Sequence, residues 1–344
     1  MIKNILITGN LGYIGSVLSE ELIKKKFNVV GFDIGYFKQC LVKRESKYKF
    51  KQIIKDIRKI NKDDLINIDA IVHLAALSND PLGDFNSKVT KDINFLATIK
   101  LAKLAKSIGV KRFIYLSSQS MYGISKKKEP IKENAPKKIA ITAYAKYKWL
   151  AEKSLMKLCD KNFAVCALRP STVFGPSPRF RSDIVFNNLT LNAFIHKIID
   201  IKSDGKPWRP VIHIKDVSLA IIICLTAETK KIYKQAFNLG FKFGNFQVIE
   251  MAKIVQNEFK GCKIQVNKSN KSDERTYIVS FEKIFKTFKN FNPKYNLLKG
   301  AQELKLFYKQ NIMNKKIVLK KTNRINILKE LIKNKKIDKN FYKN

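Results

Sequence analysis

The N-terminal segment places the tightest constraint on how this chain can fold. Residues 5–8 are an apolar strand that runs into a turn containing Gly9, Gly12 and Gly15, and a helical pattern follows at once. Gly9 permits a tight turn, Gly12 lets the backbone approach a pyrophosphate, and Gly15 lets the helix pack closely on the strand. The N–H groups and the positive dipole end of the helix would then face the phosphates. The pattern predicts a dinucleotide-binding turn, with a plain strand-to-helix turn as the alternative. The residues predicted to contact the cofactor here are Gly9, Leu11, Gly12, Tyr13, Ile14 and Gly15.

The first half of the chain repeats this alternation of strands and helices. We expect strands at residues 3–8, 28–33, 51–55, 70–75, 112–117 and 163–169, and helices at residues 12–25, 88–107 and 142–159. Such an alternation is typical of an α/β protein with a parallel sheet. We therefore predict a Rossmann fold, a doubly wound parallel sheet, over residues 1–170.

The regular alternation weakens after residue 170. Here we expect a strand at residues 210–213 and helices at residues 183–198, 216–227, 246–259 and 297–310. This pattern predicts a smaller mixed region over residues 171–311 that receives a ligand at the edge of the first domain. Residues 312–344 form a Lys-rich tail whose apolar residues keep helical spacing, and we expect a surface helix there.

An acidic residue at the end of the second expected strand bears on the choice of cofactor. Asp33 lies about 20 residues after the glycine turn, where a carboxylate can accept hydrogen bonds from the ribose hydroxyls and repel a 2′-phosphate. Asp33 therefore favours NAD over NADP, with a loop-capping surface residue as the alternative. Asp56 and Ile57 follow the third strand, where the adenine edge would lie.

Tyr144 and Lys148 are four residues apart and share one face of the helix expected at residues 142–159. A nearby ammonium group stabilises phenolate and lowers the tyrosine pKa from about 10 toward the working range. Tyr144 can then act as the general base on a substrate hydroxyl while a hydride leaves the same carbon. The spacing arises easily by chance in a Lys-rich chain. Its place after a dinucleotide turn and a fifth strand favours the catalytic interpretation.

A cluster of hydroxyl side chains follows the strand expected at residues 112–117. The segment 117–123 reads Ser-Ser-Gln-Ser-Met-Tyr-Gly, and ligands bind at the carboxyl ends of parallel strands in this architecture. We take Ser118 as the hydroxyl that holds the substrate oxygen and relays its proton. Serines that merely cap a turn are the alternative.

The net charge of +40 would suit a nucleic-acid binder, but its distribution argues otherwise. The cations are overwhelmingly Lys and are spread over the whole length, which indicates a general drift in composition and no binding patch. Only nine are Arg, and an Arg retained in such a chain suggests a site that needs a planar, bidentate fork for phosphate or carboxylate. Five of the nine lie beside motifs of the second half: Arg169, Arg179, Arg181, Arg209 and Arg275.

Several other classes of protein are disfavoured. No apolar run reaches the ~18 residues of a membrane span, and the N-terminus lacks the pattern of a signal peptide. The five scattered cysteines are expected to be free thiols in a reducing cytoplasm. The three histidines lie far apart, which argues against a metal site, and we interpret His73 as a hydrogen-bonded histidine inside a strand.

The glycine turn, Asp33, the segment 117–123 and the Tyr144–Lys148 pair, in this order, resemble the extended short-chain dehydrogenase/reductase family. More narrowly they resemble its NAD-dependent epimerase/dehydratase branch, over about residues 3–307. The resemblance implies a Rossmann domain that binds NAD, a C-terminal region that binds a nucleotide-sugar, and a triad of Ser118, Tyr144 and Lys148. It also implies a homodimer paired through the helices at residues 88–107 and 142–159.

The resemblance implies further cofactor contacts. Tyr144 and Lys148 would lie at the nicotinamide end, where Lys148 bonds the ribose, and Asn94 would support the active site. Leu74, Ala75 and Ala76 would line the cofactor.

It also implies a substrate side in three segments. Residues 168–176 resemble the family's LRxxxxYGP stretch, with Phe174 in place of the tyrosine. Asn188 lies in a segment like one that contacts the nucleotide diphosphate. Arg209 stands where a diphosphate-binding Arg is expected, although Pro210 replaces the family's Asp, and Arg275 stands where a second such Arg is expected. Surface ion pairs are the alternative roles of these arginines.

One departure from the family narrows the chemistry. The 4,6-dehydratases of this branch carry an Asp-Glu pair directly after the catalytic hydroxyl, and this chain has Gln119 and Ser120 there. Because neither is a usable acid, dehydration is disfavoured. The leading hypothesis is an epimerase that acts on a nucleotide-sugar through a transient 4-keto sugar, with polysaccharide building blocks as the destination that the resemblance suggests.

Three alternatives remain open from the sequence. A 4-dehydrogenase or 4-keto reductase would use the same triad. A regulator or scaffold would bind the dinucleotide without turnover, although an intact triad argues against it. An RNA-binding protein driven by the net charge would lose affinity steeply with salt.

Overall fold

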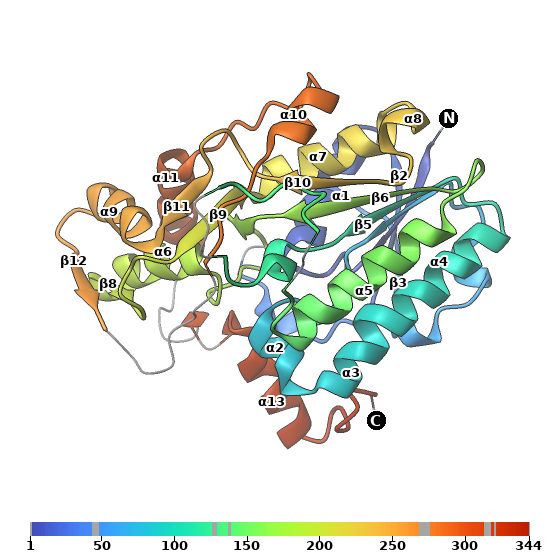
Figure 1. Cartoon of the computed structure of the whole chain (residues 1–344). Coiled ribbons are helices and arrows are strands. Elements are labelled where there is room, and N and C mark those ends of the chain that lie inside the picture. The colour runs from blue at the N-terminus through green and yellow to red at the C-terminus, as the bar shows by residue number, and fades with distance from the viewer. Residues whose placement is uncertain are drawn as a thin grey trace.

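A seven-stranded parallel sheet lies at the centre of the molecule, with helices on both faces (Figure 1). The computed structural model describes residues 2–42, 48–125, 129–136, 139–267, 276–312, 318–319 and 321–343. The strands follow the order β10-β6-β5-β4-β1-β2-β3, and every neighbouring pair is parallel. Their bounds are β1 Asn4–Thr8, β2 Asn28–Asp33, β3 Lys51–Ile54, β4 Ala70–His73, β5 Arg112–Leu116, β6 Ala164–Pro170 and β10 Gln235–Leu239. The chain winds outward from β1 in both directions, so the predicted doubly wound Rossmann fold is confirmed.

Helices cover the two faces of this sheet in separate apolar clusters. On one face lie α1 (Tyr13–Lys24), α7 (Ile214–Thr226) and α10 (Glu282–Thr287). On the other lie α4 (Thr98–Ser107) and α5 (Ala143–Leu158), which run side by side in Figure 1. The strands between them are apolar on both faces, as buried parallel strands are.

The helix expected at residues 88–107 is divided by a wider turn. It consists of α3 (Ser87–Lys91), a π-helical segment Asp92–Ala97, and α4. In the π-helical segment the Asn94 side chain accepts a hydrogen bond from the Leu77 N–H at 2.8 Å and donates one to the Leu77 carbonyl at 3.1 Å. The irregular turn therefore ties this helix to the loop that follows β4, and π-helical turns of this kind occur often at functional sites.

A smaller mixed region flanks one end of the sheet, as predicted. It holds a three-stranded sheet, β11-β9-β7, and a two-stranded sheet, β12-β8. Its elements are β7 Thr172–Phe174, α6 Val185–His196, β8 Ile198–Ile201, β9 Trp208–His213, β11 Asn245–Gln247, α9 Val248–Glu258, β12 Lys263–Val266 and α11 Leu297–Asn311. The short helix α8 (Thr229–Ile232) packs instead against β6 and β10 of the central sheet. Strand β10, from the same stretch of chain, is hydrogen-bonded to β6 of the central sheet.

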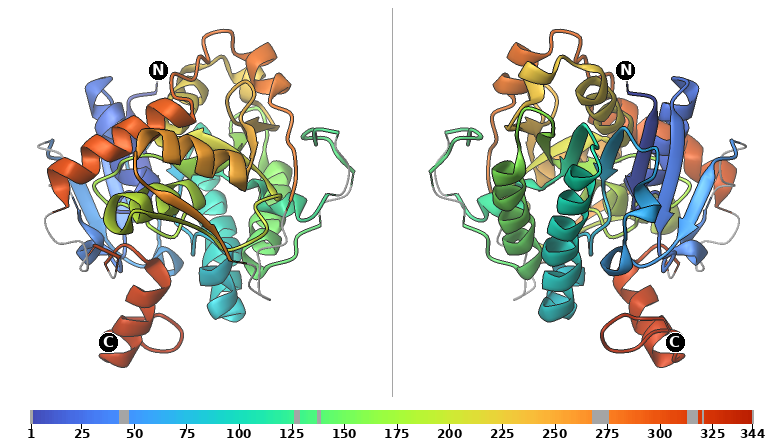
Figure 2. Two further views of the ribbon diagram at one scale, coloured as in Figure 1. Left: turned by 90° about the vertical axis from the view of Figure 1, so that its left-hand side faces the viewer. Right: turned by 90° about the vertical axis from the view of Figure 1, so that its right-hand side faces the viewer.

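One helix boundary expected in the second half is wrong, and the C-terminal helix is found. The helix expected at residues 183–198 ends at His196, because Lys197 adopts a left-handed conformation (φ 58°) and the chain continues as β8. The C-terminal tail forms the expected helix, α13 (Arg324–Lys333), whose polar face is exposed while the opposite face packs on the protein. Its Leu328 is fully buried in the apolar cluster of α4 and α5. Figure 2 shows α13, in red, well away from α11 and below the central sheet.

Other expectations for the interior are confirmed. His73 is fully buried, its ring nitrogens lie 2.7 Å from the Thr8 hydroxyl and 2.8 Å from the Thr98 hydroxyl, and burial lowers its pKa to about 3. All five cysteines are free. In the part of the chain that the structure describes, no helix is both long and apolar enough to cross a bilayer.

A buried ion pair fastens helix α5 to strand β6. Arg169 and Glu152, each 3% exposed, meet at 2.5 Å, and Arg169 also donates to the Tyr122 hydroxyl at 2.9 Å. Removing one member of such a pair leaves an uncompensated charge in the interior, which costs more than the pair contributes.

We expect Glu152→Ala to lower the free energy of unfolding by about 3–5 kcal/mol, because Arg169 then remains buried without its carboxylate. Urea denaturation measures this loss. Glu228→Ala, which removes an exposed carboxylate paired with Lys230, is the control and should leave the midpoint nearly unchanged. Equal effects of the two variants would contradict this role of the buried pair.

Candidate active site

A cavity of about 690 Å³ opens at the carboxyl ends of the parallel strands, where ligands bind in doubly wound sheets. The N-terminal glycine turn, the end of β2, the loop after β4 and helix α5 form one side of it. The β7–α6 loop, β8, β9 and the C-terminal segment form the other. Of the sequence-predicted residues, the cavity is lined by Gly9, Gly12, Tyr13, Ile14, Gly15, Asp33, Asp56, Ile57, Leu74, Ala75, Ala76, Ser118, Tyr144, Lys148, Asn188 and Arg209.

The glycine turn is built so that the backbone itself forms the floor of the cavity. Gly9 has a φ of +78°, and a Cβ there would lie 2.7 Å from the Ala75 nitrogen. A Cβ on Gly15 would lie 2.2 Å from the Gly9 carbonyl oxygen. Helix α1 begins after Gly12 with no side-chain cap, so its first N–H groups are left to a ligand. This cradle fits the diphosphate of a dinucleotide.

The end of β2 is held against the same turn. The Asp33 carboxylate accepts hydrogen bonds from the Gly35 N–H at 2.7 Å and from the Leu11 N–H at 3.3 Å. Leu11 thus connects the turn to Asp33 without lining the cavity. Burial raises the pKa of Asp33, while the hydrogen bonds and the nearby Arg179 and Arg324 oppose that shift. A carboxylate so placed suits ribose hydroxyls.

Asp56 and Ile57 line the wall beyond β3. The Asp56 carboxylate is paired with Arg58 at 2.5 Å and accepts the Arg58 N–H at 2.9 Å. Its charge is therefore already neutralised within the protein.

Ser118, Tyr144 and Lys148 meet in this cavity. Ser118 forms a hydrogen bond with Tyr144, and its Oγ accepts the Ser120 N–H at 3.1 Å. Lys148, 4% exposed, donates from Nζ to the Leu116 carbonyl at 2.6 Å and lies 4.7 Å from the centre of the Tyr115 ring. The i, i+4 spacing on α5 thus directs both side chains to the end of β5.

The expected lowering of the tyrosine pKa by the neighbouring ammonium is not found in the protein alone. Burial raises the pKa of Tyr144, and the hydrogen bond with Ser118 is the first influence that opposes this shift. Burial also lowers the pKa of Lys148 to about 7, against a smaller opposing effect of Glu152. Sequence spacing showed that the two groups share a helix face, but it could not show how far both are removed from water.

Helix α2 (Asp80–Phe85) fixes the position of Tyr144 from outside the triad. The Thr142 hydroxyl donates to the Asp80 carboxylate, and the Ala143 N–H donates to Asp84 at 2.8 Å. A Cβ on Gly83 would lie 2.7 Å from the Tyr144 Cβ, so only glycine allows this approach of the two helices. Asn94 also acts from outside the cavity, since its side chain brackets Leu77.

On the substrate side the structure places Asn188 and Arg209 in the wall. Asn188 donates to the Ser182 carbonyl at 3.0 Å, and Arg209 donates to the Trp208 carbonyl at 3.0 Å. Phe174 is fully buried and packs against Phe186 and His213, outside the cavity lining. Arg275 lies outside the described residues.

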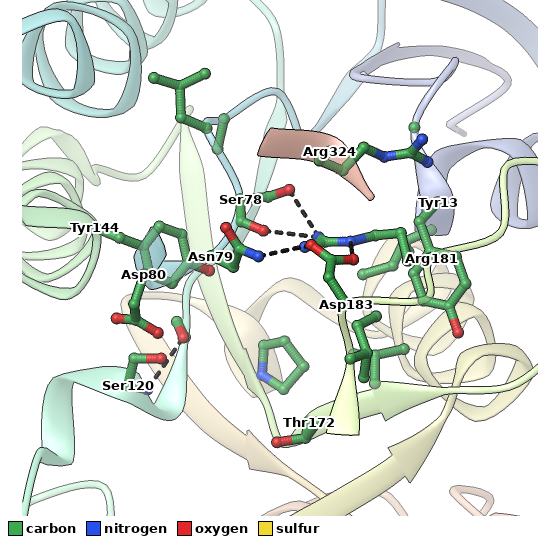
Figure 3. A pocket seen from close by; sticks show the side chains of 18 of the residues that line it. Tyr13, Ser78, Asn79, Asp80, Ser120, Tyr144, Thr172, Arg181, Asp183 and Arg324 are labelled. Atoms are coloured by element: carbon green, nitrogen blue, oxygen red, sulfur yellow. Dashed lines mark hydrogen bonds and ion pairs between the residues drawn. The ribbon is translucent and has the colours of Figure 1, made fainter. Parts of the chain in front are cut away.

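An unforeseen charged network crosses the middle of the cavity (Figure 3). Arg181 forms a bidentate pair with Asp183, at 2.9 Å and 2.7 Å, and donates to the Ser78 carbonyl at 2.7 Å. Asn79 donates to the same Asp183 carboxylate at 2.8 Å. The network joins the loop after β4 to the loop before α6. Arg181, an arginine in a Lys-rich chain, was the one sequence signal for this network.

Other lining residues gave weaker signals or none. The C-terminal segment contributes Leu319, Asn323 and Arg324, although the tail was expected at the surface. Two of the arginines singled out in the sequence hold the protein together instead. Arg169 belongs to the buried pair with Glu152, and Arg179 donates to the carbonyls of Phe37 and Lys38 at 3.0 Å and 2.6 Å.

Comparison with known proteins agrees with this geometry. Residues 5–240 match the model of the NAD dependent epimerase/dehydratase family. UDP-glucuronate 4-epimerase of Thermodesulfobacterium geofontis is 26% identical over 324 residues, which cover 89% of this chain and 96% of that protein. UDP-glucose 4-epimerase of Lactobacillus helveticus is 30% identical over 275 residues, which cover 73% of this chain and 81% of that protein.

A solved structure supports the same relationship. UDP-glucuronic acid 4-epimerase from Bacillus cereus, in complex with UDP-glucuronic acid and NAD, superimposes with a TM-score of 0.76 and 25% identity, covering 89% of this chain and 99% of that one. The family match spans the glycine turn, Asp33 and the three residues Ser118, Tyr144 and Lys148. The chain therefore belongs to the NAD dependent epimerase/dehydratase family, which confirms the predicted family, the prediction of an enzyme and the predicted NAD cofactor.

Proposed function

We propose that this enzyme is a UDP-sugar 4-epimerase that works through a transient 4-keto sugar. The observation that carries the proposal is that Ser118, Tyr144 and Lys148 share one cavity with the glycine turn. The relatives support the proposal, because a UDP-glucuronate 4-epimerase and a UDP-glucose 4-epimerase both align over most of this chain.

Each member of the triad has a role that follows from its contacts. Tyr144 takes the proton of the C4 hydroxyl as the general base. Ser118, whose Oγ is already oriented by the Ser120 N–H, holds the substrate oxygen and relays the proton. Lys148 contributes positive charge near the phenolate and binds the nicotinamide ribose. NAD, when bound, supplies a positively charged ring that accepts the C4 hydride and later returns it.

The return of the hydride to the opposite face of the ketone inverts C4. Tyr144 then gives its proton back to the C4 oxygen, so the protein ends the cycle in its starting state. The nucleotide diphosphate holds the sugar while its ring turns over. We assign that grip to Asn188 and Arg209, with Arg275 as a further diphosphate-binding residue.

The neighbours of Ser118 disfavour the elimination of water. The Gln119 amide donates to the carbonyls of Arg169 at 2.9 Å and Leu239 at 3.2 Å, and Gln119 is not among the residues that line the cavity. Ser120 does line it, but a hydroxyl is too weak an acid to expel the C6 oxygen. This arrangement favours an oxidation and reduction at C4 without loss of the C6 hydroxyl.

We expect Tyr144→Phe to lower kcat by about 100-fold or more, because it removes the general base and leaves the ring in place. The assay incubates the enzyme with UDP-glucose or UDP-glucuronic acid and separates the 4-epimers by chromatography. Tyr147→Phe, on the same helix and outside the cavity lining, is the matched control and should retain wild-type turnover.

The same incubation separates the epimerase from a net dehydrogenase or reductase. Epimerisation regenerates NAD, so the absorbance of NADH should not change in proportion to turnover. Sustained accumulation or loss of NADH with product would reject the proposal in favour of a 4-dehydrogenase or 4-keto reductase.

The burial of Lys148 predicts a pH dependence of stability. Its pKa falls from 10.5 to about 7 on folding, so between these values the unfolded chain binds more protons than the folded protein. Stability from this group therefore rises with pH above 7, and the penalty for the buried ammonium is fully present below pH 7.

Lys148→Met removes that penalty. The free energy of unfolding of the variant minus that of the wild type should therefore be largest at pH 6 and should decrease toward pH 10. Urea midpoints measured across this range test the sign. Lys146→Met, on the exposed side of the same helix, is the control. A difference between Lys148→Met and wild type that does not vary with pH would contradict the burial of a titrating ammonium.

We also propose a homodimer paired through the helices of residues 87–107 and 143–158. Leu96, 48% exposed, lies on this surface in the π-helical segment. Leu96→Glu would place a charge in the interface, so sedimentation should show a shift from dimer to monomer at equal concentration. A wild-type protein that sediments as a monomer would refute this assembly.

A further inference from the structure

The C-terminal segment crosses the rim of the cofactor cavity. We call residues 318–319 and 321–343 the C-terminal strap; α13 lies within it. At its start Val318 packs in the apolar cluster of α6, α9 and α11. Farther on, Leu328 and Phe341 pack in the cluster of α4 and α5 on the central sheet. Between these points Leu319, Asn323 and Arg324 line the cavity.

The strap is fastened to both sides of the cavity by specific bonds. The Ser182 N–H, in the loop before α6, donates to the Thr322 carbonyl at 3.3 Å. Arg58, after β3, donates to the carbonyls of Asn340 at 2.7 Å and Phe341 at 3.0 Å. The Tyr36 hydroxyl, after β2, also donates to the Phe341 carbonyl. The strap is therefore a fixed part of the cavity wall.

Arg324 brings a buried cation to this wall (Figure 3). It is 2% exposed, it lies 4.9 Å from the centre of the Phe37 ring, and its Nη2 donates to the Arg179 carbonyl at 2.7 Å. Its Nη1 is buried and has no hydrogen-bond partner. No ion pair joins Arg324 to a carboxylate among the described residues, and burial lowers its pKa. A buried cation in this state is costly unless a ligand supplies the counter-charge.

The surroundings of Arg324 identify the chemistry of that ligand. It acts electrostatically on Asp33, the predicted ribose contact, and on Asp183. Asp183 is already held by Arg181 in a bidentate pair. The glycine turn offers backbone dipoles to a diphosphate but no formal positive charge. Arg324 is a cation at this end of the cavity that forms no ion pair with a carboxylate among the described residues, although Cys40 and Asp183 partly oppose the effect of its burial.

We propose that Arg324 is a dinucleotide-binding residue, supplied by the C-terminal strap, which binds the diphosphate of NAD. The proposal rests on NAD as the cofactor and is independent of the sugar reaction proposed above.

The test measures binding to the full chain, freed of nucleotide, by titration calorimetry. Arg324→Gln should weaken NAD and ADP-ribose by about 10-fold or more, which is the effect of losing one charge-assisted hydrogen bond. Adenosine, which lacks the diphosphate, should bind both forms of the protein equally. Arg324→Lys should retain part of the affinity for NAD. Lys333→Gln, on the exposed end of the same helix, is the matched control and should change nothing.

Thermal melting separates ligand binding from a structural role. If the guanidinium waits for a ligand, Arg324→Gln leaves the melting temperature of the nucleotide-free protein unchanged or higher, while the added stability from NAD shrinks. A lower melting temperature with unchanged affinity for NAD would overturn the proposal. Equal losses for adenosine and NAD, or a loss confined to NADP, would overturn it as well. If the wild-type protein shows no epimerase activity but Arg324→Gln still weakens NAD binding, the proposed function fails and the role of Arg324 is supported.

Discussion

The close approach of the glycine turn to the loop after β4 is the constraint on which the site depends. Gly9 contacts the backbone of Ala75 so closely that any side chain would collide with it. The Leu74 N–H donates to the Thr8 carbonyl at 3.0 Å. Farther along the same loop, the Leu77 N–H donates to the Asn94 side chain. These backbone contacts fix the floor on which the diphosphate would lie. The same loop continues to Asp80, whose carboxylate accepts a hydrogen bond from the Thr142 hydroxyl at the start of helix α5.

Burial of the catalytic side chains lowers the stability of the fold. Helix α5 carries Lys148 into a place where burial lowers its pKa to about 7, although the Leu116 carbonyl, the Tyr115 ring and the more distant Glu152 favour its charge. Glu152, one helical turn after Lys148 on α5, is itself paired with Arg169 of β6. Burial likewise raises the pKa of Tyr144. Burial therefore favours the neutral form of both groups, and the positive ring of bound NAD would favour the phenolate that the proposed reaction needs.

What sequence could predict follows from how local each feature is. The strands, the glycine turn and the shared helix face of Tyr144 and Lys148 depend on residues close in the chain, and they were found. Strand β8 was missed, because the left-handed conformation of Lys197 leaves no mark in the apolar pattern. The pKa directions were missed, because burial is a property of the assembled sheet. The cavity role of Arg324 was missed, because the Lys-rich composition of its helix suggested a solvated surface.

Arg324 is also an arginine in a Lys-rich chain, but it lies beside no recognised motif. Of the arginines that do, Arg169 and Arg179 bond to groups of the protein itself. A strap that carries Arg324 also bears on the chemistry. A net dehydrogenase must exchange its nicotinamide cofactor at every turnover, whereas an epimerase regenerates NAD in place and gains by retaining it. The C-terminal strap is hydrogen-bonded to both the sheet and the smaller region, and a cavity wall fastened in this way would hinder such exchange. The strap therefore favours the epimerase over the net oxidoreductase on grounds that the triad, common to both, does not provide.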